Sequence, residues 1–262
     1  MSREREVASC DGTPPAAHTN NRAKETPSGT GTIAGVIPVV AAVPAITTRQ
    51  MIEVDRIMIE DLGIDLPRMM ENAGRNLAEL AIELFEPRQV QVLAGSGGNG
   101  GGVLVAARHL ANRGVGVRVT TTTDVSAMSP VAGHQARILN RMEVEFSEHP
   151  DSTGLVLDGL IGYSLAGAPR GRALELIEWS NDQTDQSHDV PSGEDSATGE
   201  TPGMADPASA TMTLALPKTG IVNHPNTGRL FLADISVPPG VYSAFGIDLV
   251  TPFRRGPIVE LA

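Results

Sequence analysis

Apolar residues at three- and four-residue spacing predict two consecutive helices. The first begins at Thr47 or Thr48, where a threonine can cap the helix, and ends at Gly63. The second covers residues 66–85 and presents one broad apolar face before Pro87 ends it. We expect most of that face to be ordinary core packing.

From residue 89 onward, short apolar runs alternate with segments of helical pattern. The predicted strands are residues 90–94, 115–120, 144–146, 155–157, 211–216 and 229–235, and the predicted helices are residues 104–111, 130–141 and 172–179. An alternation of this kind implies right-handed crossovers between parallel strands. The pattern therefore predicts an α/β fold with a largely parallel sheet of about seven or eight strands, covered by helices on both faces.

One segment breaks the alternation. A buried strand is expected to run into Asp189, yet every residue from 181 to 188 is polar, whereas central parallel strands are normally apolar. If that strand is frayed, Asp189 and Ser192 are poorly positioned. The residues that follow, 192–209, are rich in Gly, Pro, Ser and Asp and predict a long surface loop.

The first part of the chain lacks the composition of a folded domain. Residues 1–30 are polar and show no apolar periodicity, so they cannot offset the entropy of ordering. We expect a disordered or poorly ordered leader over residues 1–45 and one domain over residues 46–262.

Charge and cysteine content narrow the classes of function. The net charge of −11 opposes a nucleic-acid partner, although backbone N–H groups can still hold a small anion. The apolar stretch 31–46 is broken by Pro38 and Pro44 and is too short to span a membrane or, at this position, to act as a signal peptide. Because Cys10 is the only cysteine, a disulfide framework is excluded. A cytoplasmic protein is the simplest interpretation.

A glycine-rich segment is the strongest local signal. Six glycines stand among the eight positions from Gly95 to Gly102, between a predicted strand and a predicted helix. Glycine lets the backbone approach a ligand, and a helix N-terminus offers free N–H groups, so a phosphate cradle is one interpretation. The segment lacks the Lys and Ser/Thr of a P-loop, and Val103 stands where a dinucleotide fingerprint prefers a small residue. A flexible turn is the alternative.

Two further loops could carry chemistry. Asp158 follows a predicted strand, at the sheet edge where ligands bind in parallel α/β folds, although an Asp that caps the next turn is an equal alternative. The segment Asp189-Val-Pro-Ser-Gly193 combines a carboxylate, a rigid proline and a serine, which suits a hard cation and equally suits a plain turn.

Taken in order, six segments resemble the NAD(P)H-hydrate epimerase family, also called the YjeF N-terminal-domain family. They are Arg68-Met-Met-Glu-Asn-Ala-Gly74, Gly95 to His109, Asp158 to Gly171, Asp189 to Gly199, Lys218-Thr-Gly220 and Asp234-Ile-Ser-Val-Pro238. The corresponding family patterns are L-M-E-N-A-G, G-P-G-N-N-G-G-D-G-L-V-A-A-R-H, D-A-L-F-G-T-G-L, D-I-P-S-G with a T-G behind it, K-x-G and D-I-G-I-P. Six segments in the right order make the resemblance specific.

The resemblance implies a Rossmann-like three-layer α/β/α sandwich and an isomerase that interconverts the R and S forms of hydrated NADH or NADPH. It implies a potassium ion held by Asn99, Asp158 and Ser192. Substrate contacts are implied at Gly98, Asn99, Gly100, Gly101, Gly102, Gly162, Tyr163, Ser164, Leu165, Ala166, Gly167, Ala168 and Asp189. Epimerisation requires proton transfer by a positioned acid or base, and Asp189 is our choice for that catalytic group.

Departures from the family pattern leave alternatives open. Gly98, Gly102 and Val103 replace an Asn, an Asp and a Gly of the family's glycine segment, so two polar side chains are absent. A non-catalytic member that binds nucleotides or proteins is therefore the main alternative. A Rossmann dehydrogenase is disfavoured because no acid stands at the usual ribose position, Asp124 lying slightly late.

The resemblance also suggests partners. Many relatives carry a fused dehydratase domain, for which a chain ending at Ala262 leaves no room, so a separate NAD(P)H-hydrate dehydratase is the expected pathway partner. A homodimer is the assembly that the family suggests.

Overall fold

The structure is a computed structural model, and it describes residues 37–41, 43–151, 154–162, 167–182, 186–188, 192–193, 195–196, 198–205 and 207–262. All of these belong to one compact unit, Gly35–Ala262. Most of the expected leader, residues 1–36, lies outside the described residues, so its disorder stays a prediction. Val39 and Val40, near the end of that leader, form a short strand.

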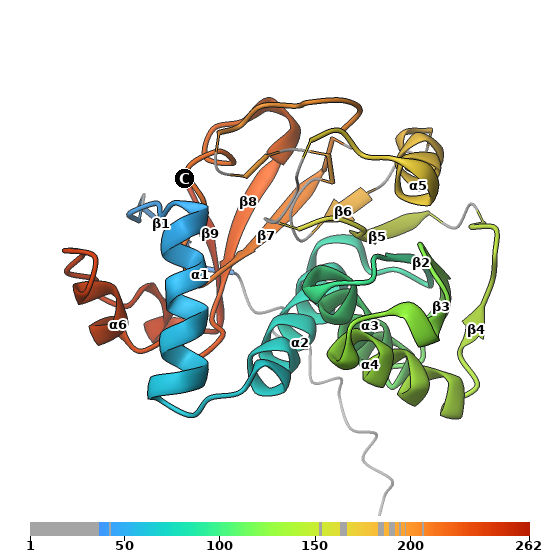
Figure 1. The fold of residues 1–262 in the computed structure, drawn as a ribbon, viewed down its shortest axis with the longest axis horizontal. Helices are drawn as coiled ribbons and strands as arrows, with labels where there is room; N and C mark the ends of the chain where they lie inside the picture. The colour runs from blue at the N-terminus through green and yellow to red at the C-terminus, as the bar shows by residue number, and fades with distance from the viewer. Residues whose placement is uncertain are drawn as a thin grey trace, which may run out of the picture. The chain divides into compact units, whose positions relative to one another are not determined.

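A single sheet forms the centre of the fold, with strands in the order β1-β9-β8-β7-β6-β5-β2-β3-β4 (Figure 1). The strands are β1 Val39–Val40, β2 Gln89–Ala94, β3 Gly116–Thr121, β4 Glu145–Phe146, β5 Leu155–Gly159, β6 Gln186–His188, β7 Ala210–Leu214, β8 Arg229–Ala233 and β9 Ile258–Leu261. Among the described strands every neighbouring pair is parallel except β8 with β9. The predicted largely parallel sheet is confirmed.

The sequence pattern missed the two strands at one edge of the sheet. The sheet has nine strands in the described residues, against the seven or eight predicted, because β1 and β9 add to them. Both are short segments next to prolines, Pro38 and Pro257, so neither shows a strand pattern of its own. They are held by backbone pairing, with the N–H of Glu260 donating to the carbonyl of Pro38 at 2.9 Å.

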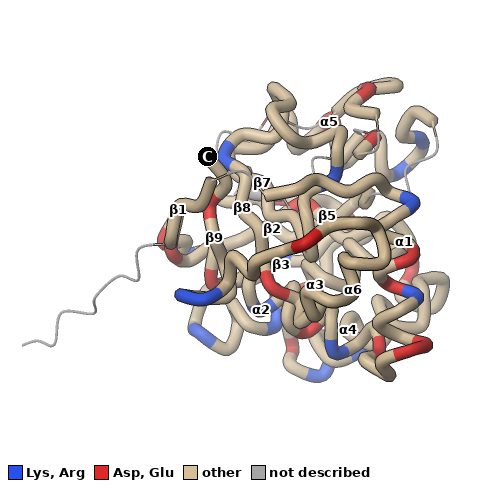
Figure 2. Tube along the Cα trace, turned by 90° about the vertical axis from the view of Figure 1, so that its left-hand side faces the viewer, with Lys and Arg blue, Asp and Glu red and all other residues tan. Residues whose placement is uncertain are grey.

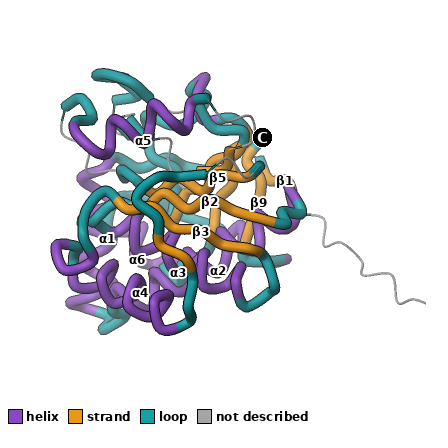
Figure 3. The backbone as a smooth tube through the Cα atoms, turned by 90° about the vertical axis from the view of Figure 1, so that its right-hand side faces the viewer, coloured by secondary structure: helices purple, strands orange, loops and turns teal. Residues whose placement is uncertain are grey.

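Helices cover both faces of the sheet. They are α1 Thr48–Arg56, α2 Leu66–Phe85, α3 Gly98–Ala111, α4 Pro130–Arg141, α5 Gly171–Asn181 and α6 Pro239–Ser243, with short 3-10 helices at Val125–Ala127, Pro225–Thr227 and Pro252–Arg255. Val90 and Val92 of β2 pack in the cluster with α2, α3 and α4, while Leu93 packs with residues of α5. Figure 3 shows α5 on one side of the strands and α2, α3 and α4 on the other. Side chains that alternate along a strand thus fill both layers.

The first two helices confirm the expected capping. The Thr47 hydroxyl accepts a hydrogen bond from the N–H of Gln50, whose side chain accepts from the N–H of Thr47, which completes a capping box. The Asp65 carboxylate accepts from the N–H of Arg68 at the start of α2. Each cap satisfies N–H groups that the first helical turn leaves without partners.

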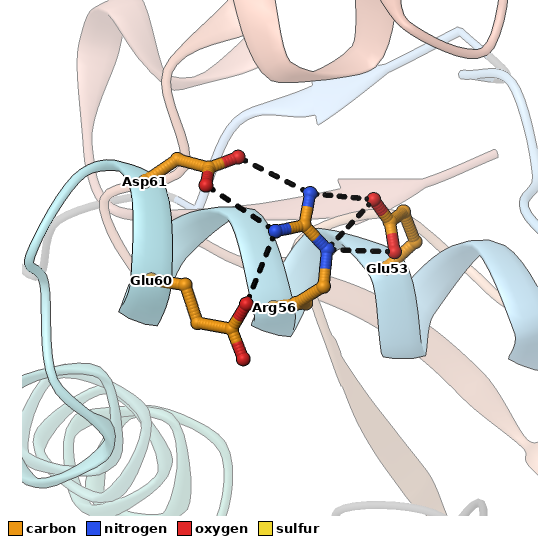
Figure 4. A network of polar contacts seen from close by, with 4 residues as sticks. All are labelled: Glu53, Arg56, Glu60 and Asp61. Carbon is orange, nitrogen blue, oxygen red and sulfur yellow. Dashed lines mark hydrogen bonds and ion pairs between the residues drawn. The ribbon is translucent and has the colours of Figure 1, made fainter.

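A π-helical turn, Ile57–Asp61, extends α1 toward the expected stop at Gly63. Arg56 spans the junction, because its guanidinium donates to Glu53 in the α-helical part and to Glu60 and Asp61 in the π-helical turn (Figure 4). The hydrogen bond with Arg56 lowers the pKa of Glu53. These groups are exposed to solvent, so the network fixes local geometry more than it stabilises the fold.

Helices α2 and α3 pack at unusually close range. A Cβ atom on Gly74 of α2 would lie 2.4 Å from the Cβ of Val105 of α3 and 2.6 Å from the carbonyl oxygen of Gly102. No other residue permits that approach without a shift of the backbone. The close contact brings α2 against the first turns of α3.

The polar segment before Asp189 does form a strand. Residues Gln186–His188 pair with β5 on one side and with β7 on the other, with His188 opposite both Asp158 and Thr211. A parallel ladder depends on backbone N–H and C=O groups, so polar side chains do not forbid it. The expected strand is therefore present although the apolar pattern is absent.

Charged residues are distributed over the whole described chain. In Figure 2, segments with Lys or Arg alternate with segments with Asp or Glu around the fold. Within the described ranges, no helix combines the length and the apolar character that crossing a membrane requires.

Candidate functional site

The glycine segment lies at the carboxyl end of β2, where it begins a helix. Helix α3 starts at Gly98, with Gly97 as its N-cap. The sequence predicted a loop here and a helix only from Leu104, which is wrong for Gly98 to Gly102. Glycine disfavours helices intrinsically, but close packing against the neighbouring elements overrides that preference. The substrate residues proposed from this segment are thus the first turns of a helix, whose leading N–H groups have no intrahelical acceptors.

Two of the glycines are required by the fold. A Cβ on Gly100 would lie 1.8 Å from the carbonyl oxygen of Gly95, and a Cβ on Gly95 would lie 2.0 Å from the carbonyl oxygen of Leu160. The turn after β2 therefore sits directly against the end of β5. In contrast, a Cβ on Gly98 or Gly102 would meet no atom within 4 Å. The close-packed glycines build the turn, and the open ones leave space beside it.

A hollow of about 350 Å³ opens at the N-terminus of α3. It is lined by the segment Ser96 to Gly100, by Thr122 after β3, by the segment Leu160 to Gly162 after β5, and by Ala173 of α5. It lies where crossovers leave β2 and β5 in opposite directions, which is the ligand-binding position of open parallel sheets. Thr122 was missed from the sequence, although its place after a parallel strand was a signal that could have found it.

The three expected cation ligands come together around Leu160 and Ile161. The Asn99 amide nitrogen lies 3.4 Å from the carbonyl oxygen of Ile161, and the Ser192 hydroxyl lies 3.5 Å from the same oxygen. The Ile161 N–H donates to the Ser192 hydroxyl at 3.1 Å. The Asp158 carboxylate accepts a hydrogen bond from the Leu160 N–H at 2.7 Å. The distant segments that carry Asn99 and Ser192 thus converge on the stretch that directly follows Asp158.

Asp158 lies within β5, one residue deeper than the sequence predicted. The strand continues to Gly159 because β5 pairs with β2 through this region, with Asp158 opposite Leu93. Asp158 and Ser192 are both fully buried. A buried carboxylate needs polar partners, and Asp158 has them in the Leu160 N–H and further contacts.

The donor chemistry of this cluster fits a hard monovalent cation. Carboxylate, hydroxyl, side-chain amide and backbone carbonyl oxygens all lie at the cluster, and these are the ligand types that bind potassium. Among the described residues, no group of three or more His, Cys, Asp and Glu side chains is arranged to hold a metal. Oxygen ligands of this kind suit hard cations.

The remaining predicted substrate residues divide into three groups. Gly162 lies at the cluster, since a Cβ on it would be 2.3 Å from the Asn99 amide oxygen. Gly167 and Ala168 are exposed and are not among the described residues that line the hollow, so their role as substrate contacts stays a prediction. Ala168 lies against Gly203. The other predicted residues, Tyr163, Ser164, Leu165, Ala166 and Asp189, lie outside the described residues.

An ion-pair cluster joins the two helices behind the site. Glu71 of α2 accepts hydrogen bonds from Arg108 and from Nε2 of His109, the latter at 2.8 Å, both on α3. Burial acts to raise the pKa of Glu71, but the hydrogen bonds from Arg108 and His109 outweigh it and lower the pKa. This contact links the Met-Glu-Asn-Ala-Gly segment of α2 to the Ala-Arg-His segment of α3.

Comparisons with known proteins identify the family and the fold. Residues 67–220 match the profile of the family described as YjeF-related protein N-terminus. An NAD(P)H-hydrate epimerase of Dehalogenimonas lykanthroporepellens is 46% identical, over 84% of this chain and 94% of that protein. A bifunctional NAD(P)H-hydrate repair enzyme of Hyperthermus butylicus is 39% identical, over 69% of this chain but only 36% of its own length.

A solved structure supports the fold alone. The crystal structure of the yeast protein ynu0 superposes with a TM-score of 0.73 at 22% identity, covering 84% of this chain and 100% of that one. The resemblance inferred from six sequence segments and the Rossmann-like α/β/α fold are confirmed. The chain belongs to the YjeF-related protein N-terminus family.

Proposed function

We propose that this protein is an NAD(P)H-hydrate epimerase, an isomerase that interconverts the R and S forms of hydrated NADH and NADPH. The observation that carries the proposal is the convergence of Asn99, Asp158 and Ser192 on Leu160 and Ile161, beside the open N-terminus of α3. The relative that is 46% identical over most of the chain is named for the same activity.

The hollow suits the phosphates of a dinucleotide. A helix N-terminus presents unpaired N–H groups and the positive end of the helix dipole, and both favour a pyrophosphate. The open faces of Gly97 and Gly98 leave room for that group to approach the backbone. Binding of this kind needs no basic side chain, which is consistent with an acidic chain.

Asp189 remains the proposed acid or base. Epimerisation at a carbon that carries a hydroxyl next to the ring nitrogen requires the hydroxyl to leave and return, or the ring to open, with proton transfer in either route. Asp189 directly follows β6, and β6 lies between β5 and β7. The residue after a strand at this edge of a parallel sheet is suited to face a bound ligand.

Asn99, Asp158 and Ser192 are the proposed holders of potassium. The bound ion would supply a fixed positive charge that keeps the three loops in one arrangement, without redox chemistry. Asp158 and Ser192 accept hydrogen bonds from the N–H groups of Leu160 and Ile161, and these bonds would then fix the backbone that lines the substrate hollow.

A coupled assay tests the proposed activity. An S-specific NAD(P)H-hydrate dehydratase, the proposed pathway partner, is mixed with purified R-hydrate, with and without this protein. We expect the protein to accelerate consumption of the R form well beyond spontaneous epimerisation. If consumption stays at the background rate while hydrated NADH binds, the protein is instead a non-catalytic nucleotide-binding member, as the replacements at Gly98 and Gly102 would permit.

A further inference from the structure

A second, smaller hollow of about 90 Å³ shares two residues with the first one, Gly98 and Asn99. Its wall is mainly apolar. The apolar lining comes from α1, α2, the end of β7 and the segment after β8, and consists of Met51, Leu66, Met69, Met70, Ala73, Leu214 and Ile235. Methionine side chains adapt to the shape of a flat ring. The hollow is therefore an apolar pocket beside the proposed phosphate site.

One carboxylate faces this pocket. Asp55 of α1 is half-buried and is the acidic residue among those that line the pocket. Most of a ligand pocket is typically apolar, with a few polar groups that fix the orientation of the ligand. A carboxylate accepts hydrogen bonds, so Asp55 selects a ring that carries N–H or O–H donors.

The third wall of the pocket is the open side of α3. Gly102 lines the pocket, and a Cβ built on it meets no atom within 4 Å. A larger residue at this position would project into the space. The first turn of α3, at Gly98 and Asn99, therefore lines both hollows.

The size of the pocket discriminates between the two bases of a dinucleotide. Benzene fills a cavity of about 150 Å³ in an engineered protein, so a hollow of about 90 Å³ takes part of one six-membered ring, with the rest at the mouth, and suits a single ring better than a two-ring purine. The larger hollow at the helix N-terminus takes the phosphates. The small pocket is then left for the single-ring end of the molecule.

We propose that this pocket binds the hydrated nicotinamide ring, and that Asp55 accepts a hydrogen bond from the carboxamide NH₂ of that ring. The inference rests on the proposed function, since it names the place of one part of the same substrate. It adds Asp55 and the pocket on α1 and α2 to the substrate-binding residues.

The test compares two ligands of the full-length protein, NADH and ADP-ribose, which differ by the nicotinamide ring. Calorimetric binding is measured for the wild type, Asp55→Ala, Asp55→Asn, Gly102→Leu and Gly102→Ala. Glu60→Gln, an exposed acid in the adjoining π-helical turn, is the control for Asp55. Gly102→Ala is the control for Gly102→Leu, because both add a Cβ while the leucine fills the pocket. Thermal melting confirms that each variant is folded.

We expect the wild type to prefer NADH. Gly102→Leu should remove that preference, with a smaller effect on the affinity for ADP-ribose, and the smaller Gly102→Ala should reduce the preference less. Asp55→Ala should weaken NADH binding about tenfold, the loss of one hydrogen bond to a charged group, and Asp55→Asn should recover part of it.

Two results would overturn the inference. One is that Gly102→Leu and Asp55→Ala weaken the binding of NADH and of ADP-ribose equally. The pocket would then hold a part of the nucleotide that both ligands share. The other is that neither variant changes the preference for NADH. If the wild type shows the expected binding pattern but no epimerisation, the proposed activity is wrong while the ring pocket stands. Failure of the ring pocket can therefore be told apart from failure of the proposed activity.

Discussion

The hydroxyl of Ser192 accepts a hydrogen bond from the N–H of Ile161 at 3.1 Å, which joins two loops that are 31 residues apart in the sequence. Ser192 is fully buried, and Ile161 lines the hollow at the start of α3. Asn99 reaches the carbonyl of the same residue. The backbone of Ile161 is therefore the point at which the loops after β5 and β6 meet the glycine-rich helix.

Substituting Ser192 tests this junction and the proposed cation site together. Ser192→Ala leaves the Ile161 N–H without its partner, which should cost about 1–2 kcal/mol of unfolding free energy. Potassium should raise the melting temperature of the wild type by mass action, relative to tetramethylammonium at equal ionic strength, and should do so less in the variant. The exposed Ser243→Ala serves as the control. An identical response of wild type and variant to both cations would rule out Ser192 as a ligand.

The glycines of α3 provide a matched pair. Gly100→Ala places a Cβ 1.8 Å from a backbone oxygen of Gly95, so the turn must move, and we expect a loss of at least about 3 kcal/mol or failure to fold. Gly98→Ala meets no atom within 4 Å and should be neutral or stabilising by up to about 1 kcal/mol, because alanine favours the helix. Chemical denaturation of both variants measures the difference. Equal losses would show that the turn tolerates a Cβ and that the glycines have another role.

The sequence predicted those elements whose local signals agree. Helix α2 was predicted with its observed bounds because its apolar face has a clear period and Pro87 marks its end, and in the structure Asp65 caps its start. The start of α3 was missed because glycine favours turns locally, and only the contact between Gly100 and Gly95 shows why a helix begins there. Strand β6 was in doubt because its side chains are polar, although pairing on both sides requires only its backbone.

The residues of the cation cluster could be predicted from the sequence, whereas those of the ring pocket could not. Asn99, Asp158 and Ser192 each follow or end a predicted strand, so their convergence could be expected from a parallel sheet. Asp55 lies on the first predicted helix, and no strand end beside it marks it as a candidate. Its place in a pocket depends on how α1 and α2 pack against α3, which no local pattern specifies.

The Glu71 cluster predicts a dependence of stability on pH. The pKa of Glu71 is lower in the folded protein, so its contribution is present above the unfolded pKa near 4.5 and is lost as the pH falls through the folded value. Because the Glu71 side chain is 43% exposed, we expect no more than about 1 kcal/mol. Denaturation at pH 7 and below pH 4 should show a smaller acid loss for Glu71→Gln than for wild type. The exposed Glu178→Gln serves as the control. If wild type and Glu71→Gln lose the same unfolding free energy between the two pH values, the cluster does not contribute to the acid sensitivity of the fold.

Asp189→Asn tests the proposed catalytic group. Asparagine keeps the size of the side chain and part of its hydrogen bonding but cannot exchange a proton near neutral pH, so epimerisation should fall about 10²- to 10⁴-fold. Binding of hydrated NADH should stay measurable, because the proposed phosphate site at α3 is unchanged. Asp195→Asn, in the same connection between β6 and β7, is the control and should keep its activity. Each rate is compared with the uncatalysed reaction, since Gly98 and Gly102 leave the site with fewer polar groups than the family pattern. If wild type and Asp189→Asn accelerate the reaction equally, the proton is moved by another group, and the carboxylate of Asp55 at the ring pocket becomes the first to test.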